Sequence, residues 1–297
     1  MKQVKVGFIG FGEAAHGISI GLKNCGLETV ICAYDKFYDQ MPAGQLIKKR
    51  AADAKVELLE SEKALTERSD IIFSSVVSKV AVEVAKSFSP YLTEKHIYAD
   101  TNAASPMVKT EVAQAISKSG AKFVDCALMG TIPAFLNKVP IFASGNGAVE
   151  FKELMTPFSM DITCLGETPG QASAIKMFRS IFMKGYVALL FETLNAANKY
   201  NAADLVMENI AETMDQADFM ETARLLVTRG LIHSERRAHE MSEVIMTLSD
   251  IGVSSIMSDA TQKKLEWCTA FKFKEYFNGE APPSLKEVLE AFVAKGV

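Results

Sequence analysis

Two glycines near the start of the chain are spaced to hold a pyrophosphate. Gly10 and Gly12 follow an apolar run over 4–9 and precede a helical pattern that begins at Ala14. Glycine permits a tight turn and lets a phosphate approach the backbone, while the helix start offers free N–H groups and the positive end of its dipole. This spacing predicts a dinucleotide-binding loop. The alternative is a glycine-rich turn between strand and helix that binds no ligand.

An acidic residue lies at the position where a dinucleotide-binding fold has the side chain that binds the adenosine ribose. Asp35 ends a second apolar run, about twenty residues after Gly12. Its carboxylate would accept hydrogen bonds from a ribose 2′-OH and repel a 2′-phosphate, so we expect NAD to be favoured over NADP. Lys36 would partly offset that negative charge. The predicted cofactor contacts are Gly10, Phe11, Gly12, Glu13, Ala14, Asp35, Lys36, Val76, Val77 and Asn102.

A lysine in the middle of the chain is the candidate acid or base. Lys176 lies early in a long helical pattern, just after Gly170, and shares one helical stripe with Ser180 and Lys184. A lysine beside a glycine turn can point into a cleft between domains, where desolvation and nearby cations lower its pKa towards the working pH. The alternative is a solvated lysine on an exposed helix face.

A late helical pattern over 234–248 carries a candidate anion ligand. His233, Arg237 and Glu240 lie on or beside the face that becomes apolar further along. An arginine there can hold a carboxylate or a phosphate through two parallel hydrogen bonds, so we predict a small-molecule substrate that carries one of these groups. The alternative is a ladder of ion pairs at i, i+3 and i+4 with no ligand.

Alternating apolar strands and amphipathic helices in the first half would position these residues. Strands are expected at 4–9, 29–34, 56–58, 71–76, 97–100, 123–127, 141–144 and 161–165. Helices are expected at 14–24, 45–52, 80–88, 106–119 and 149–155. This alternation predicts a doubly wound, mostly parallel sheet.

Beyond Gly170 the pattern is helical throughout. Helices are expected at 172–200, 204–214, 219–227, 234–248, 256–269 and 285–294. We therefore predict an α/β protein in which a Rossmann-type dinucleotide-binding domain over 1–166 is joined by a long interdomain helix to an all-helical substrate and dimerisation domain over 167–297.

Composition excludes several other functional classes. The 297 residues carry a net charge of −4 with dispersed Lys and Arg, which argues against nucleic acid or an anionic membrane as partner. The five cysteines are scattered and the four histidines stand in no ligand-like spacing, so we expect reduced thiols and no metal. A strand that starts almost at once and the lack of a long apolar run predict no signal peptide, no membrane span and a cytoplasmic protein.

Four segments resemble the β-hydroxyacid dehydrogenase superfamily, which includes 3-hydroxyisobutyrate and 6-phosphogluconate dehydrogenases. They are Gly7–Gly12, Asp100–Pro106, Val124–Gly130 and Gly166–Met177, in the family's order. The resemblance implies hydride transfer between a nicotinamide cofactor and a small hydroxy acid or its carbonyl counterpart, with Lys176 exchanging the hydroxyl proton. If the carboxylate is β to the new carbonyl, decarboxylation could follow.

The chain also departs from the family pattern. Asn102 replaces a serine, Met129 replaces a serine that contacts substrate, Ser180 replaces an asparagine, and His239-Glu240 replaces a Lys-Asp pair. The resemblance implies these substrate contacts: Asn102, Met129, Gly130, Thr131, Ser180, Arg237 and His239. The late helix resembles a phosphogluconate-dehydrogenase-related subgroup and indicates a divergent branch. An imine-reductase-like enzyme and a non-catalytic dinucleotide-binding protein remain the alternatives.

Large apolar residues surround most of the long helix between Phe178 and Phe191. A helix buried on one side should keep a polar stripe over about half of its circumference. Relatives in the family commonly complete such burial with a second subunit, so we expect a homodimer. The alternative is that helices of the same chain surround this helix fully.

Overall fold

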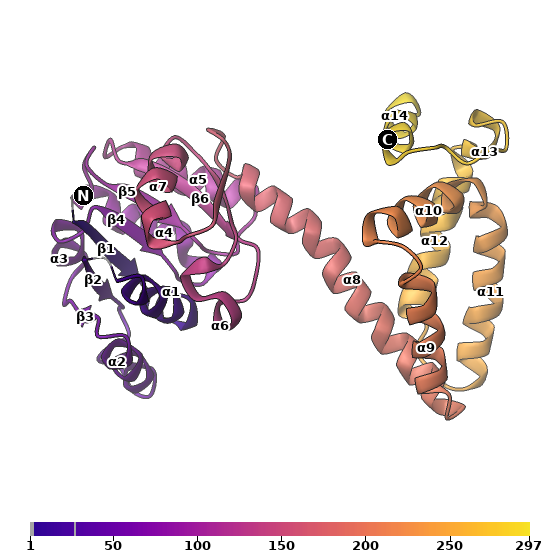
Figure 1. Cartoon of the computed structure of the whole chain (residues 1–297), viewed down its shortest axis with the longest axis horizontal. Coiled ribbons are helices and arrows are strands. Elements are labelled where there is room, and N and C mark those ends of the chain that lie inside the picture. The colour runs from indigo at the N-terminus through magenta and orange to yellow at the C-terminus, as the bar shows by residue number, and fades with distance from the viewer. Residues whose placement is uncertain (1–2, 27) are drawn as a thin grey trace. The chain divides into compact units, whose positions relative to one another are not determined.

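The computed structural model describes residues 3–26 and 28–297, which divide into two compact units (Figure 1). The N-terminal unit covers residues 1–181 and the C-terminal unit covers 182–297. The division falls within helix α8 (Gln171–Lys199), beyond the boundary expected at residue 166. The reason is that the first turn of α8 packs into the N-terminal unit, where Ala172 and Ser173 are buried.

An eight-stranded sheet runs through the N-terminal unit in the order β3-β2-β1-β4-β5-β6-β7-β8. Neighbouring strands are parallel except β6 and β7. The strands are β1 (Val4–Ile9), β2 (Thr29–Tyr34), β3 (Glu57–Leu58), β4 (Ile71–Ser74), β5 (Ile97–Asp100), β6 (Lys122–Leu128), β7 (Ile141–Ser144) and β8 (Ile162–Gly166). From β1 the chain first builds outward through β2 and β3, and then resumes on the other side with β4. Ligands of doubly wound sheets bind at such a reversal of strand order.

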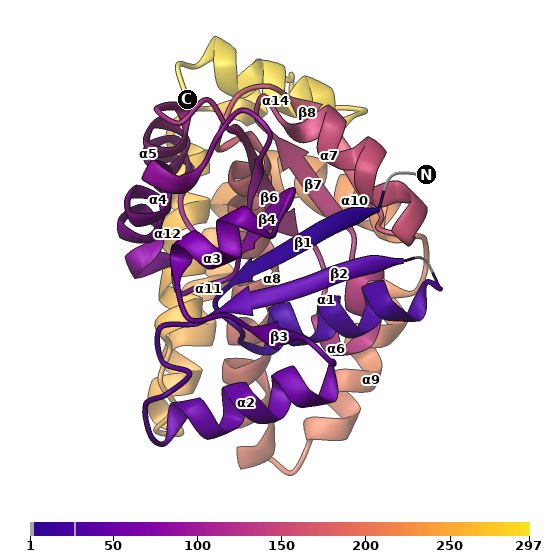
Figure 2. The same cartoon turned by 90° about the vertical axis from the view of Figure 1, so that its left-hand side faces the viewer.

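Alternating side chains of the central strands fill two separate cores. Val6 and Phe8 of β1 belong to one core, whereas Ile9 belongs to the other. Helices cover both faces of the sheet (Figure 2). The first core is covered by α1 (Glu13–Asn24), α2 (Ala43–Asp53), α6 (Ile132–Phe135) and α7 (Ala148–Met155), and the second by α3 (Glu62–Glu67), α4 (Ala81–Phe88) and α5 (Pro106–Ser117). Short 3₁₀ helices are η1 (Ser78–Val80), η2 (Ser89–Tyr91), η3 (Leu136–Lys138) and η4 (Thr156–Phe158).

The predicted fold class is confirmed, and the strand ends differ by a few residues. β4 ends at Ser74 rather than at Val76, because the Val76 N–H bonds to the Asn102 side chain instead of a neighbouring strand.

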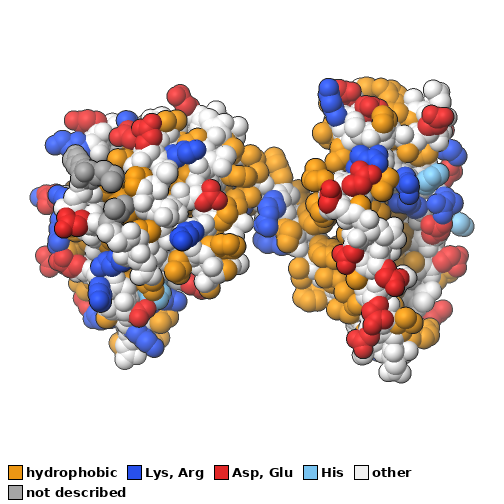
Figure 3. Space-filling model, in the orientation of Figure 1, with side chains coloured by type: hydrophobic (Ala, Val, Ile, Leu, Met, Phe, Trp, Pro, Cys, Tyr) orange, Lys and Arg blue, Asp and Glu red, His pale blue; other side chains and the backbone are white. Residues whose placement is uncertain are grey.

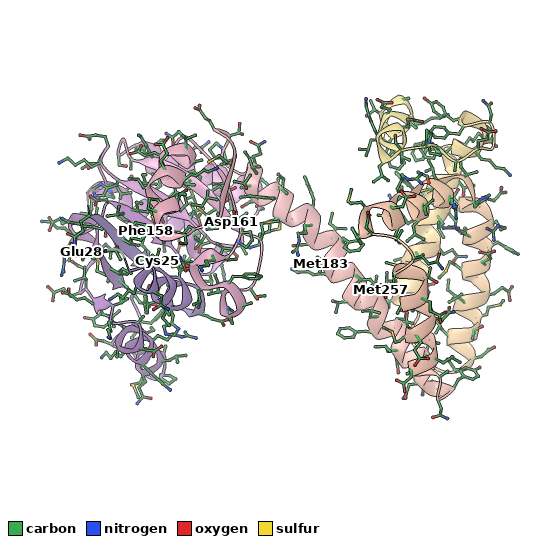
Figure 4. All side chains as sticks on the ribbon, in the orientation of Figure 1. Cys25, Glu28, Phe158, Asp161, Met183 and Met257 are labelled. Carbon is green, nitrogen blue, oxygen red and sulfur yellow. The ribbon has the colours of Figure 1, made fainter. Side chains whose placement is uncertain are left out.

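The C-terminal end of α1 is held by a segment that comes later in the chain. The Cys25 thiol donates to the Phe158 carbonyl across 2.9 Å (Figure 4). Asn137 Nδ2 donates to the same carbonyl across 2.6 Å. These bonds hold the helix whose start follows the glycine loop.

Helices make up the C-terminal unit, as the sequence predicts. After α8 come α9 (Ala203–Met214), α10 (Phe219–Ile232), α11 (Ser234–Asp250), α12 (Ile256–Ala270), α13 (Phe273–Tyr276) and α14 (Leu285–Ala294). Glu192 of α8 holds the start of α12, because its carboxylate accepts the N–H groups of Met257 and Ser258, each across 2.8 Å (Figure 4 labels Met257). A small hydrophobic core joins α10, α13 and α14 and consists of Leu231, Phe273, Val288 and Ala291.

The five cysteines are free thiols, two of them buried and three partly buried. Within residues 3–26 and 28–297, no three His, Cys, Asp or Glu side chains lie close enough together to hold a metal ion. Over the same residues no helix combines the length and apolar character needed to cross a membrane.

Candidate functional site

A cavity of about 450 Å³ opens at the carboxyl ends of β1, β2, β4 and β5, at the reversal of strand order. Its wall comes from the ends of these strands, from the loops that follow them, and from residues of α3 and α4. The predicted cofactor residues on its wall are Gly10, Gly12, Glu13, Ala14, Asp35, Lys36, Val76, Val77 and Asn102. Phe11 differs from the others, because its side chain is fully buried in the core.

The two loop glycines meet different surroundings. Gly10 has φ +79°, and a Cβ there would lie 2.6 Å from the Ser75 carbonyl oxygen, so no larger residue fits. At Gly12 a Cβ would meet no atom within 4 Å among the described residues, its chain neighbours aside. Gly12 is also the N-cap of α1, and no side chain in the described part of the chain caps that helix start. Open space beside uncapped N–H groups fits a pyrophosphate, for which a helix N-terminus provides donors and positive potential.

Asp35 joins the ends of β1 and β2. Its Oδ2 accepts the Phe11 N–H across 2.9 Å, and its Oδ1 accepts the Phe37 N–H across 2.9 Å. The carboxylate is therefore fixed at the cavity wall by two backbone donors. Each oxygen keeps a further lone pair that could accept a hydrogen bond from a ribose hydroxyl.

A second acidic side chain at the cavity was missed from the sequence. Glu62 lines the cavity together with Asp35 and Tyr34. Burial and then the carboxylates of Glu62 and Asp35 raise the pKa of the Tyr34 phenol. Glu62 begins α3, which Ser61 caps through its side chain. A Ser-Glu helix start three residues after the short strand β3 is the signal that the sequence offered. Apolar residues complete this end of the cavity: Val80, Val84 and Phe88.

Asn102 holds the loop after β4 as well as lining the cavity. Its Oδ1 accepts the Val76 N–H across 2.7 Å, and its Nδ2 donates to Ser74 Oγ across 3.1 Å. The Asn102 N–H in turn donates to Asp100 Oδ1 across 2.9 Å. The side chain is buried, so its position is fixed before any ligand binds.

The other predicted substrate residues of the N-terminal unit do not line this cavity. Met129 is half-buried and its N–H donates to the Pro140 carbonyl across 2.8 Å, whereas Gly130 and Thr131 are exposed at the start of α6. Lys176 and Ser180 are half-buried one turn apart on α8. Ser180 Oγ donates to the Lys176 carbonyl across 2.9 Å, so this hydroxyl is engaged within its own helix.

Arg237 and His239 lie on α11 in the C-terminal unit. Arg237 is half-buried, whereas His239 is exposed. The ion pair of this helix forms between Arg236 and Glu240, both exposed, at the i, i+4 spacing. This ion pair involves Arg236, and Arg237 is the more buried of the two arginines.

A fully buried ion cluster, also missed from the sequence, is hydrogen-bonded to Asn102 of the cavity wall. Lys109 Nζ is 3.1 Å from Asp100 Oδ1 and 3.2 Å from Asp125 Oδ1, and it donates to the Asp100 carbonyl across 2.8 Å. Burial raises the pKa of the Asp100 carboxyl, while Lys109 and the Asn102 N–H act in the opposite direction. The two aspartates are direct neighbours in the register of β5 and β6.

Comparisons with known protein families cover most of the chain. Residues 5–166 match the NAD binding domain of 6-phosphogluconate dehydrogenase, and residues 197–268 match a domain of unknown function, DUF1932. An uncharacterized 28.5 kDa protein of Methanothermus fervidus is 32% identical over 268 residues, which is 89% of this chain and 100% of that protein. Bovine mitochondrial 3-hydroxyisobutyrate dehydrogenase is 26% identical over 182 residues, covering 59% of this chain and 52% of that enzyme.

Solved structures with the same fold include close and distant proteins. Conserved protein MTH1747, described as structurally similar to 3-hydroxyacid dehydrogenases, is 30% identical with a TM-score of 0.59, covering 94% of this chain and 100% of that one. A reductive aminase from Aspergillus terreus, solved with NADPH and ethyl levulinate, is 15% identical with a TM-score of 0.73, covering 91% of this chain and 94% of that one. The chain therefore belongs to the β-hydroxyacid dehydrogenase-like superfamily, with the NAD-binding domain of 6-phosphogluconate dehydrogenase and a divergent C-terminal domain.

Proposed function

We propose that this protein is a nicotinamide-dependent oxidoreductase that acts on a small hydroxy acid or its carbonyl counterpart. The observation that carries the proposal is the open space at Gly12, beside the uncapped start of α1 and within reach of a cavity that Asp35 lines. Gly10, Gly12 and the first N–H groups of α1 would hold the pyrophosphate. The bound nicotinamide accepts or supplies the hydride.

NAD is the proposed cofactor. Asp35 and Glu62 place two carboxylates on the cavity wall, and together they would repel a ribose 2′-phosphate. Lys36 is the nearby cation, and its Nζ lies 4.9 Å from the Phe37 ring centroid. The distant Aspergillus terreus reductive aminase was solved with NADPH, so the fold itself accepts a 2′-phosphate. Here the acidic pair supports NAD.

Lys176 is the proposed acid and base. Its amino group takes the substrate hydroxyl proton in oxidation and returns it in reduction. Asn102 and Ser180 would orient the substrate and the nicotinamide, and the backbone of Gly130 and Thr131 would bind a carboxylate. We further propose that Met129 contacts the substrate and that Arg237 and His239 bind its carboxylate or phosphate. A β-keto acid formed in this way would lose CO₂.

A homodimer is the proposed assembly. Large apolar side chains of α8 are exposed in the single chain, with 67% of Phe178, 75% of Ile181 and 70% of Phe191 accessible. Hydrophobic side chains gather along this helix (Figure 3). An apolar groove of about 570 Å³ also runs between α8, α9 and α11. A second copy of the chain would cover these apolar surfaces.

A cytoplasmic location is also proposed, and the free thiols of the five cysteines support it.

Two measurements test the proposed function. Calorimetric titration with NAD and with NADP should give tighter binding of NAD, and equal or reversed affinities would exclude the assignment of the cofactor. A panel of short hydroxy acids, their oxo forms, and cyclic imines should then be assayed with both cofactors. Turnover of a hydroxy acid supports the proposal.

An imine-reductase-like activity is the second candidate, because Ser180 and Met129 depart from the hydroxyacid dehydrogenase pattern and the distant reductive aminases share the fold. Turnover of imines alone would favour that activity. Tight NAD binding without turnover of any compound would favour a dinucleotide-binding protein that has lost its chemistry.

A further inference from the structure

The first turn of α8 is capped by side chains from two strands of the sheet. Ala172 N–H donates to Ser144 Oγ across 3.1 Å, and Ser173 N–H donates to Asp125 Oδ2 across 2.9 Å. Ser173 Oγ also donates to Asp125 Oδ1 across 2.7 Å. The first N–H groups of a helix have no partner within the helix, so these bonds satisfy donors that would otherwise be buried and unpaired.

Asp125 is suited to this capping role by its charge. A carboxylate at a helix N-terminus interacts favourably with the positive end of the dipole. Asp125 is fully buried, and the fully buried Lys109 lies 3.2 Å from its Oδ1. Lys109 therefore supplies the countercharge that a buried carboxylate needs, and leaving either member alone would be strongly destabilising.

The same ion cluster also reaches the cavity. Lys109 bonds Asp100, and Asp100 Oδ1 accepts the N–H of Asn102, whose side chain holds Val76. One buried cation thus links the cavity wall to the start of α8. Lys176 lies less than one helical turn after Ser173, so any shift of that first turn moves Lys176 by a similar amount.

We infer that Asp125, held by Lys109, is a positioning residue that fixes Lys176 relative to the dinucleotide cavity through Ser173. The inference rests on the proposed role of Lys176 as acid and base. Proton transfer requires a well-defined geometry, and a displacement of about 1 Å can lower the rate roughly 100-fold. Asp125 and Ser173 touch no substrate in this scheme and act through the placement of α8, whereas Lys109 also acts on the cavity wall through Asp100.

Ser173→Ala is the mildest test, because it removes one hydroxyl and leaves the Lys109–Asp125 pair intact. We expect kcat to fall by about ten- to 100-fold, with the affinity for NAD within about twofold of the wild type. Ser173→Thr keeps the hydroxyl and should restore most of kcat. Ser69→Ala is the matched control: this buried serine donates to the Leu65 carbonyl, far along the chain from α8, and should leave kcat unchanged.

Hydrogen exchange gives a readout that does not depend on turnover. In Ser173→Ala the amides at the start of α8 should exchange roughly tenfold faster, while those of α1 stay unchanged. Asp125→Asn should show larger effects on both kcat and exchange. Unchanged exchange at the start of α8, or a normal kcat in Ser173→Ala, would overturn the inference even if Asp125→Asn fails to fold.

Lys176→Ala, measured in parallel, separates this inference from the proposed function. Loss of turnover in Lys176→Ala with normal turnover in Ser173→Ala contradicts positioning by Asp125 and leaves the role of Lys176 in place. Normal turnover in Lys176→Ala contradicts the role of Lys176, and with it the inference. Loss of turnover in both, with faster exchange at the start of α8 in Ser173→Ala, supports both.

Discussion

The Phe11 N–H donates to Asp35 Oδ2 across 2.9 Å, and this bond joins the glycine loop after β1 to the end of β2. The residue that would read the ribose therefore also holds the backbone that would bind the pyrophosphate. A substitution at Asp35 should consequently affect both the strength of cofactor binding and the choice between NAD and NADP.

Asp35→Asn tests that choice. The amide keeps one acceptor but loses the negative charge that repels a 2′-phosphate. We expect the ratio of NAD to NADP affinity to fall by about tenfold or more, which corresponds to about 1.4 kcal/mol. Calorimetric titration with both cofactors measures the ratio, and Asp39→Asn, at an exposed position further along the same loop, serves as the control. An unchanged ratio would show that Asp35 does not select the cofactor.

Gly12→Ala and Gly10→Ala should behave differently. A methyl group at Gly12 enters space without protein atoms, so the melting temperature should change little while NAD affinity falls. At Gly10 the positive φ and the 2.6 Å approach to the Ser75 carbonyl should instead destabilise the fold by about 1–3 kcal/mol. Thermal unfolding and NAD titration of both variants distinguish the two effects. Normal NAD binding by a folded Gly12→Ala would place the pyrophosphate elsewhere.

Lys176→Ala should abolish turnover and keep cofactor binding. Removal of a general acid or base typically lowers the rate by ~100- to 10,000-fold. Steady-state kinetics and NAD titration measure the two effects separately. Lys184→Ala is the matched control and should retain activity, because Lys184 lies on the same helical stripe but two turns beyond Lys176. Equal losses in the two variants would argue that a general change in α8, rather than Lys176 itself, is responsible.

Phe191→Asp should separate the proposed dimer. The side chain is 70% exposed in the single chain, so the substitution would cost little in a monomer but would bury a charge at an interface. Sedimentation should show a mass near twice 32.4 kDa for the wild type and near 32.4 kDa for the variant. Val149→Asp alters an exposed apolar residue of α7 and should keep the wild-type mass. A wild-type mass near 32.4 kDa would rule out the dimer.

Cys126 should be the least reactive thiol of the folded protein. Burial raises its pKa well above the ordinary value, and the neighbouring Asp125 carboxylate acts in the same direction. A raised pKa leaves less thiolate at pH 8, and the thiolate is the reactive form. Peptide mapping after alkylation should therefore find Cys126 unmodified until denaturant is added. Early modification of Cys126 would show that this part of the sheet opens readily.

Periodicity predicted the fold well because the strands alternate between two apolar cores and the glycine loop is local in sequence. Asp35 could be predicted because its distance from the loop follows from a strand–helix–strand unit. The ion cluster could not, because Asp100, Lys109 and Asp125 belong to three separate elements. Only the register between β5 and β6 brings the two carboxylates together, and Lys109 resembles an ordinary surface residue of a helix.

The residues that line the dinucleotide cavity all fall between Ile9 and Ala103. The remaining two thirds of the sequence can accumulate substitutions without altering any of these side chains. Apart from Asn102, the proposed substrate residues lie beyond this stretch, so selection to retain the nucleotide and selection for a new reactant act mostly on different parts of the gene. Such separation fits a chain in which residues 5–166 match the NAD binding domain of 6-phosphogluconate dehydrogenase and residues 197–268 match a different family, DUF1932.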